Sequence, residues 1–157
     1  MPHVKTILVP IDFSNVTEGV VAEAAALANL RPARIVLLNV ISPPLYPYEF
    51  SDIPESIVPL IAATEKASAR ELARWRRELL RRGVPSRIVQ MSGVPAQVIL
   101  EQAEKLSADH IVIGSHGHTA LYDLIAGSTT TRVLKSAPCP VVVVPAQKVS
   151  RPRVQAA

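Results

Sequence analysis

Five short apolar runs alternate along this chain with longer segments in which apolar side chains recur every three or four residues. The short runs are rich in Val, Ile and Leu, and polar residues do not alternate within them. Such strands are buried on both faces, which is typical of a parallel sheet covered by helices on both sides. The expected strands are 4–9, 34–40, 86–91, 109–114 and 140–144, and the expected helices are about 16–29, 55–82, 95–106 and 129–135.

The ends and faces of the helices follow from local signals. Ser14 or Asn15 can cap the first helix, and Gly83 ends the long one. The connection over 41–54 is rich in Pro and Tyr and longer than most, which favours a functional role that the sequence does not specify. The long helix is expected to bury a stripe of eight residues, namely Ile57, Leu60, Ile61, Thr64, Ser68, Leu72, Trp75 and Leu79.

Composition narrows the class of protein. With 157 residues and 48% hydrophobic content, we expect one domain over 1–146 and a loose basic tail over 147–157. No signal peptide or membrane span is recognisable, and the single cysteine, Cys139, fits a reducing cytoplasm. A net charge of +4 with only six aromatic residues does not predict nucleic-acid binding.

A basic stripe lies on the long helix, on the face opposite Leu72 and Leu79. Glu71 and Glu78 offer partners three or four residues away, so we expect a solvated face, with an acidic partner as the alternative. The stripe consists of Lys66, Arg70, Arg74, Arg77 and Arg81.

The candidate chemistry lies between the fourth strand and the last helix. Gly114-Ser115-His116-Gly117 follows the strand, and Gly127-Ser128-Thr129-Thr130 opens the helix. Glycines in such a position allow backbone N–H groups to approach an anion, and a helix N-terminus adds partial positive charge. The pattern predicts a phosphate site.

Asp12 follows the first strand and has two interpretations. It accepts hydrogen bonds from ribose or meets a bound metal, or it is a turn residue that helps to cap the first helix. The phosphate-loop, dinucleotide-binding and hydrolase-elbow motifs are all absent from the sequence. His116 and His118 lack a convincing third ligand, so no catalytic or metal-binding residue is predicted, and a solvent-facing or phosphate-adjacent role in the loop is favoured.

These features together resemble the universal stress protein family. The resemblance rests on Gly114-x2-Gly117-x9-Gly127-Ser128, on Val-Pro-Ile-Asp at 9–12 and on Pro-Cys-Pro-Val-Val-Val-Val-Pro at 138–145. It implies a five-stranded parallel sheet in the order 3-2-1-4-5, a Rossmann-like fold with helices on both faces, and membership of the ATP-binding branch. One departure is Thr131, where relatives often carry an acidic residue.

Carried over residue by residue, the resemblance assigns the nucleotide contacts. Adenosine would contact the end of the first strand, with Asp12 on the ribose, and adenine would contact the backbone of Val40. The glycines and the start of the last helix would hold ribose and phosphates. The full set is Pro10, Ile11, Asp12, Val40, Ile113, Gly114, Gly117, His118, Gly127, Ser128, Thr129 and Thr130.

The function expected is that of a cytoplasmic regulatory stress-response module that binds ATP, with Mg²⁺ held through the phosphates. The alternatives are a slow ATPase and a nucleotide-free interaction module. Neither a nucleic acid nor a membrane is expected as a partner. A homodimer is expected through the last strand, Val141, Val142, Val143 and Val144, because its run of valines carries no charge to discourage pairing.

Overall fold

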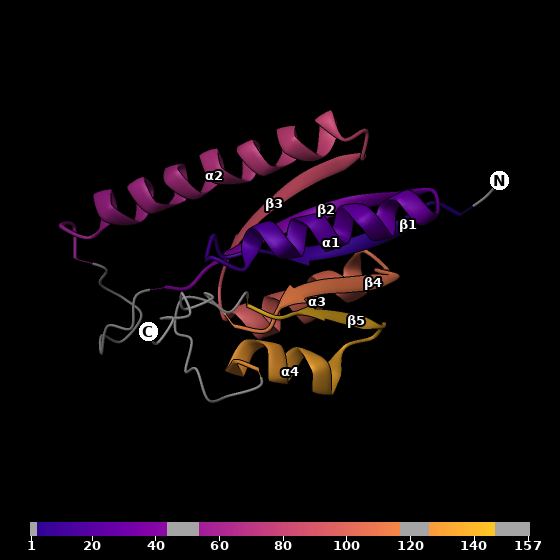
Figure 1. Cartoon of the computed structure of the whole chain (residues 1–157). Coiled ribbons are helices and arrows are strands. Elements are labelled where there is room, and N and C mark those ends of the chain that lie inside the picture. The colour runs from indigo at the N-terminus through magenta and orange to yellow at the C-terminus, as the bar shows by residue number, and fades with distance from the viewer. Residues whose placement is uncertain (1–2, 44–53, 117–125, 147–157) are drawn as a thin grey trace, which may run out of the picture.

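The computed structural model describes residues 3–43, 54–116 and 126–146. Five parallel strands form one sheet in the order β3-β2-β1-β4-β5, which confirms the predicted fold (Figure 1). Most expected bounds are correct to within two residues. The elements are β1 (Lys5–Pro10), α1 (Thr17–Leu30), β2 (Ala33–Ile41), α2 (Val58–Arg81), β3 (Ser86–Ser92), α3 (Pro95–Lys105), β4 (His110–Gly114), α4 (Ser128–Ser136) and β5 (Val141–Val144).

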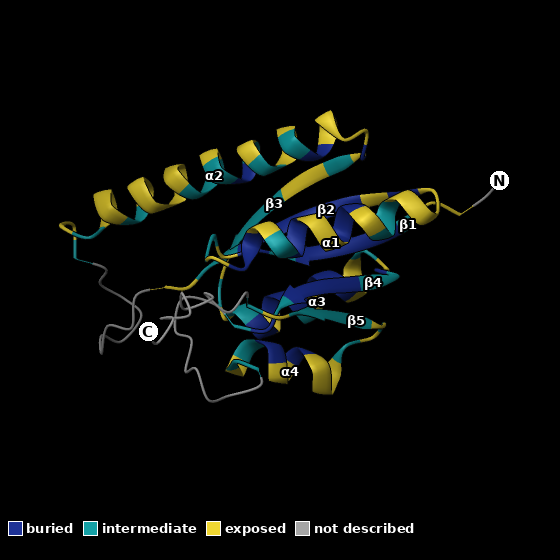
Figure 2. Ribbon diagram, in the orientation of Figure 1, coloured by how far each residue is buried: buried dark blue, intermediate teal, exposed yellow. Residues whose placement is uncertain are grey.

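The core is divided between the two faces of the sheet, because successive strand residues point in opposite directions. On one face Val9 and Leu37 pack with α1 and α2, and on the other Leu8 and Leu38 pack with α3 and α4. All four side chains are fully buried, as the dark blue strands of Figure 2 show. This double burial explains why β1, β2 and β4 are mostly apolar, whereas the outer strands β3 and β5 are only partly buried.

Helix α2 departs from the expected pattern of burial. Only Leu72 and Leu79 of the predicted stripe are buried, and Leu60 is 64% exposed. The first half of α2 extends past the end of the sheet (Figures 1 and 2), and its contact with β3 includes a hydrogen bond from Gln90 Nε2 to Glu65 O at 3.0 Å. Gly83, with φ of +72°, ends the helix region as predicted, and Val84 N–H then donates to Leu79 O.

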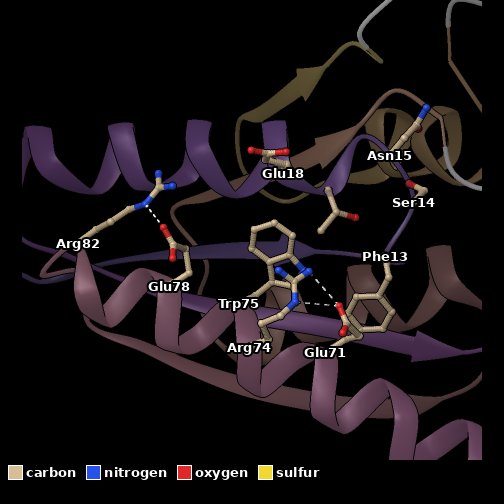
Figure 3. Close-up of a pocket in the computed structure, with 10 residues that line it drawn as sticks. Phe13, Ser14, Asn15, Glu18, Glu71, Arg74, Trp75, Glu78 and Arg82 are labelled. Carbon is tan, nitrogen blue, oxygen red and sulfur yellow. Dashed lines mark hydrogen bonds and ion pairs between the residues drawn. The ribbon is translucent and has the colours of Figure 1, made fainter. Parts of the chain in front are cut away.

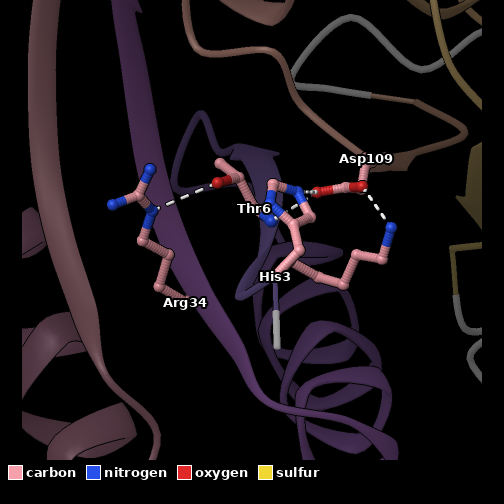
Figure 4. A network of polar contacts seen from close by, with 5 residues as sticks. His3, Thr6, Arg34 and Asp109 are labelled. Atoms are coloured by element: carbon pink, nitrogen blue, oxygen red, sulfur yellow. Dashed lines mark hydrogen bonds and ion pairs between the residues drawn. The ribbon is translucent and has the colours of Figure 1, made fainter. Parts of the chain in front are cut away.

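A polar network fastens β1 to the start of β4, at the amino ends of the strands (Figure 4). Asp109 accepts a hydrogen bond from Lys5 Nζ at 2.7 Å and another from Thr6 N–H at 2.8 Å. His3 Nε2 lies 3.5 Å from the same carboxylate. The hydrogen bonds from Lys5 and from Thr6 hold the pKa of Asp109 below its ordinary value.

Candidate functional site

A cleft of about 930 Å³ opens at the carboxyl ends of β1, β2 and β4. β1 and β4 are neighbours in the sheet, but the chain continues from β1 to β2 on one side and from β4 to β5 on the other. Ligands of parallel α/β sheets bind at such a switch point. Ten of the residues predicted for the site line this cleft, namely Pro10, Ile11, Asp12, Val40, Ile113, Gly114, Gly127, Ser128, Thr129 and Thr130.

Some predictions fall on residues for which no structure is described. Gly117 and His118 of the predicted site lie outside the described residues, as do most of the connection over 41–54 and the tail over 147–157. Their assignments therefore stay predictions from the sequence.

The turn from β1 to α1 sets the position of Asp12. Its Oδ1 accepts a hydrogen bond from Ser14 N–H at 3.0 Å, and the next residue, Phe13, has φ of 63°. A left-handed conformation costs a non-glycine residue about 1–2 kcal/mol, so the turn is held against strain. Asp12 thus has the turn role of the second interpretation, while its position on the cleft also suits the first.

The expected cap of α1 is wrong. The residue at the cap position is Val16, and within the described chain no side chain caps the helix. Ser14 instead contributes its backbone carbonyl, which accepts from Thr17 N–H at 3.1 Å. The side chain of Asp12 already bonds Ser14 N–H, so this turn closes at Ser14, three residues before the helix begins at Thr17.

Gly114 is needed for packing as well as for access to the cleft. A Cβ at this position would lie 2.5 Å from Val16 Cγ1, so any larger residue would force Val16 or the backbone beside it to shift. The following residue, Ser115, connects three segments. Its N–H donates to Val144 O at 2.8 Å, its carbonyl accepts from Gly127 N–H at 2.7 Å, and its Oγ accepts from Ala146 N–H at 3.2 Å.

The first turn of α4 faces the cleft. The first helical hydrogen bond runs from Thr131 N–H to Gly127 O at 2.9 Å, so the N–H groups of the three preceding residues have no partner within the helix. Thr130 Oγ1 donates to Gly114 O at 2.7 Å and is buried, which fixes the start of α4 against the end of β4. Its side chain therefore positions the turn, and its backbone remains the candidate for anion binding.

Sequence reasoning missed several residues of the cleft. Thr64 and Ser68 of α2 were expected to face the core, but they line the cleft together with Pro95 and Ile99 of α3. Asn39 of β2 was also missed, although a polar residue within the apolar run 35–41 is a detectable signal. His116 reaches the cleft too, and its Nδ1 lies 3.0 Å from Ser115 Oγ.

The electrostatics of the cleft are unusual for a phosphate site. In the part of its lining that the structure describes, there is no lysine and no arginine. An anion there would be bound by uncharged donors, namely the backbone N–H groups at the start of α4 and the hydroxyl groups of Ser128 and Thr129, or by His116. Within residues 3–43, 54–116 and 126–146, no group of three or more His, Cys, Asp or Glu side chains could hold a metal ion.

A second hollow, of about 390 Å³, lies between the start of α1 and the charged face of α2 (Figure 3). Arg74 pairs with Glu71 at 3.0 Å and stacks 4.4 Å from the centre of the Trp75 ring. Arg82 pairs with Glu78 at 3.0 Å. None of the predicted nucleotide contacts lines this hollow.

The basic stripe on α2 is partly neutralised within its own helix. Arg74 and Arg81 pair with Glu71 and Glu78, each three residues earlier, as the spacing predicted. Exposed pairs of this kind contribute little to stability, typically about 0.2–1 kcal/mol. An acidic partner for the stripe stays an untested alternative.

Comparison with known proteins places this chain in a family. A model of the universal stress protein family matches residues 3–145. Universal stress protein A homolog 1 of Coxiella burnetii is 36% identical over 146 residues, covering 90% of this chain and 96% of that protein. In the described structure, no helix is long and apolar enough to cross a membrane.

Solved structures agree with this relationship. The structure of protein MJ0577 of Methanocaldococcus jannaschii is 29% identical, with a TM-score of 0.80 over 92% of this chain and 97% of that one. A universal stress protein of Archaeoglobus fulgidus in complex with dAMP shares the fold at 21% identity, with a TM-score of 0.63 over 91% and 98% of the two chains. By sequence and by fold, the chain belongs to the universal stress protein family.

Proposed function

We propose that this protein binds ATP in the cleft at the carboxyl ends of β1, β2 and β4, with Mg²⁺ held through the phosphates. Occupancy of the cleft would then regulate contact with a partner. The observation that carries the proposal is the first turn of α4, whose N–H groups have no partner within the helix and open on the same cleft as Asp12. A helix N-terminus attracts phosphate through these donors and through its partial positive charge.

The opposite side of the cleft suits a nucleoside. Pro10, Ile11, Val40 and Ile113 supply apolar surface, and Asp12 supplies a carboxylate at the end of β1. Apolar walls with a few placed polar groups are typical of small-molecule sites. The dAMP complex of the Archaeoglobus fulgidus protein supports the idea that this fold accommodates an adenine nucleotide.

The absence of lysine and arginine from the described lining of the cleft favours binding of ATP without rapid hydrolysis. Hydrolysis needs stabilisation of the charge that develops on the transferred phosphoryl group, usually by Lys, Arg and Mg²⁺. The described lining offers neither cationic side chain. We therefore expect phosphate release far slower than the ordinary enzyme rate of about 1 per second or more.

Calorimetric titration with ATP and Mg²⁺ tests the proposal, after bound nucleotide has been removed by denaturation and refolding. Gly127→Val should weaken binding by about tenfold or more, a change of about 1.4 kcal/mol or more. A Cβ at Gly127 would lie 3.6 Å from Ser115 O, and φ of −71° suits any residue, so the variant should fold.

Gly19→Ala is the matched control. A Cβ at Gly19 would lie at an ordinary 3.4 Å from a methyl group of Val144, and this residue does not line the cleft. It should bind ATP like the wild type. The proposal fails if the wild type neither releases a nucleotide on denaturation nor binds added ATP, and steady phosphate release at enzyme rates would refute its regulatory form.

A further inference from the structure

Asn39 is a polar residue buried within an apolar strand. It follows four buried apolar residues of β2 and is itself only 5% exposed. Its Nδ2 donates to Ile11 O at 2.9 Å. Its Oδ1, also buried, has no hydrogen-bond partner in the part of the chain that the structure describes. A buried acceptor left unpaired is costly, so the site is built to receive a donor.

The orientation of the amide is determined by its surroundings. A backbone carbonyl can only accept a hydrogen bond, so the amide atom beside Ile11 O has to be the nitrogen. The oxygen therefore points the other way and can only accept. Thr17 also lines the cleft and has a buried hydroxyl without a partner among the described residues, but a hydroxyl can donate or accept. Of these two groups, only Asn39 Oδ1 requires that a ligand supply a hydrogen-bond donor.

Asn39 lies at the end of β2 that borders the cleft. The register between β1 and β2 ends at Pro10 and Leu38, whereas β2 continues to Ile41. Asn39 and Val40 thus lie beyond the last β1–β2 pair and both line the cleft. The side chain of Asn39 points to the same face of the sheet as Leu37, beneath α1 and α2.

We propose that Asn39 Oδ1 accepts a hydrogen bond from the exocyclic amino group of the nucleobase, so that the cleft selects adenine over a 6-oxo purine. This inference rests on the proposed nucleotide site and goes further by naming the residue that reads the base. An amino group satisfies the buried acceptor. The oxygen at the same position of hypoxanthine or guanine faces it with a second acceptor and leaves both unpaired.

Calorimetric titration with ATP and with inosine triphosphate, its 6-oxo counterpart, measures this selectivity. The wild type should prefer ATP by about tenfold or more, the equivalent of one hydrogen bond. Asn39→Leu removes the acceptor at similar volume and should bring the two affinities to within about twofold of each other. Thr130→Val is the matched control, because it removes a buried hydrogen bond of the same cleft and should lower both affinities without changing their ratio.

Two further measurements cover the case in which Asn39→Leu does not fold and the case in which the donor is the ribose and not the base. If Asn39→Leu does not fold, the side-chain amide resonance of Asn39 in the wild type is followed by NMR, and it should shift with ATP but not with inosine triphosphate. Equal shifts would overturn the assignment. Titration with 2′-deoxy-ATP tests whether a ribose hydroxyl is the donor to Asn39 instead. If the wild type binds ATP more tightly than 2′-deoxy-ATP and Asn39→Leu binds the two equally, the assignment to the base is overturned.

The outcome also distinguishes this inference from the proposed function on which it depends. A wild type that binds neither nucleotide refutes the nucleotide site and the role of Asn39 together. A wild type that binds ATP and inosine triphosphate equally well refutes only the role of Asn39.

Discussion

At the scale of single residues, polar side chains next to the cleft mainly position backbone. Asp12 bonds Ser14 N–H, Ser115 Oγ accepts from Ala146 N–H, and Thr130 Oγ1 donates to Gly114 O. Each bond connects the end of a strand with a segment that follows it or lies beside it. A substitution here changes the shape of the cleft as well as its chemistry, so each test needs a readout for both.

Asp12→Ala tests whether the carboxylate contacts ribose in addition to closing its turn. If it does, ATP affinity should fall about tenfold or more, because a hydrogen bond to a charged group contributes about 1.5–3 kcal/mol. 2′-Deoxy-ATP should then lose little further affinity in the variant. A variant with wild-type ATP affinity and a lowered melting temperature would leave Asp12 with the turn role alone.

Asp109→Asn tests the network at the opposite end of the sheet. Because the folded pKa of Asp109 is lowered by Lys5 and Thr6, its ionised form stabilises the fold above the unfolded pKa, near the ordinary value of 3.8. We expect the variant to lose about 1–2 kcal/mol at pH 7, or roughly 3 °C per kcal/mol in melting temperature. The difference should vanish as pH falls below about 4, through the lowered folded pKa.

Denaturant unfolding at several pH values measures this effect. Glu23→Gln, a change on the exposed side of α1, is the control and should match the wild type throughout. If Asp109→Asn stays less stable than the wild type at low pH, the variant loses stability because the amide disturbs packing and not because a charge is lost.

At the scale of elements, α2 and α4 contribute different things to the cleft. α4 presents uncharged N–H donors at its first turn, whereas α2 extends past the sheet and brings Thr64 and Ser68 to the cleft wall. Neither element brings a lysine or arginine into the described lining. The negative charges of a triphosphate are thus left for a cation to neutralise.

Removal of Mg²⁺ should therefore weaken binding of ATP much more than binding of AMP. Mg²⁺ is usually held through phosphate oxygens, and AMP has fewer charges to neutralise. Titrations with and without EDTA should show an ATP affinity lower by about tenfold or more in EDTA, a change of about 1.4 kcal/mol. An ATP affinity that is the same in EDTA would mean that protein cations outside the described lining reach the phosphates.

At the scale of the whole molecule, β5 forms an edge of the sheet, with β4 as its neighbour in the described structure. Pro140 O accepts from Ile111 N–H of β4 and Val144 O accepts from Ser115 N–H, which directly follows β4. By the alternation along a strand, the N–H groups of Val141 and Val143 therefore point to the open edge. An uncharged edge of this kind favours pairing with another strand. We propose a two-fold antiparallel pairing of β5 with its copy, which closes the edge.

Val143→Pro tests the dimer without disturbing the sheet. It removes an N–H that points away from β4, and proline is tolerated at such edge positions. Light scattering should give the mass of two chains for the wild type and one for the variant, with similar circular dichroism. Val142→Pro is the contrasting variant, because its N–H points toward β4 and its loss should unfold the sheet. A monomeric wild type at tens of micromolar would refute the pairing.

Sequence reasoning was most successful where hydrophobic pattern and motif agreed. Apolar runs identified the strands, most clearly the central ones β1, β2 and β4, because a strand buried on both faces carries few polar residues. It failed for the stripe on α2, because periodicity shows which face of a helix is apolar but not how far the sheet beneath it extends. Leu60 and Leu72 fit the same pattern, yet only Leu72 lies over a strand.

The sequence by itself determined the elements, the family and ten residues that the fold brings to one cleft, because these depend on local pattern and on a motif. Only the tertiary structure decided what each group does there. It showed that Gly114 lies against Val16, that Thr130 Oγ1 donates to Gly114 O and that the buried Asn39 Oδ1 has no hydrogen-bond partner among the described residues. The physical reason is that these roles depend on contacts between residues far apart in the chain, and spacing along the sequence carries no record of such distances.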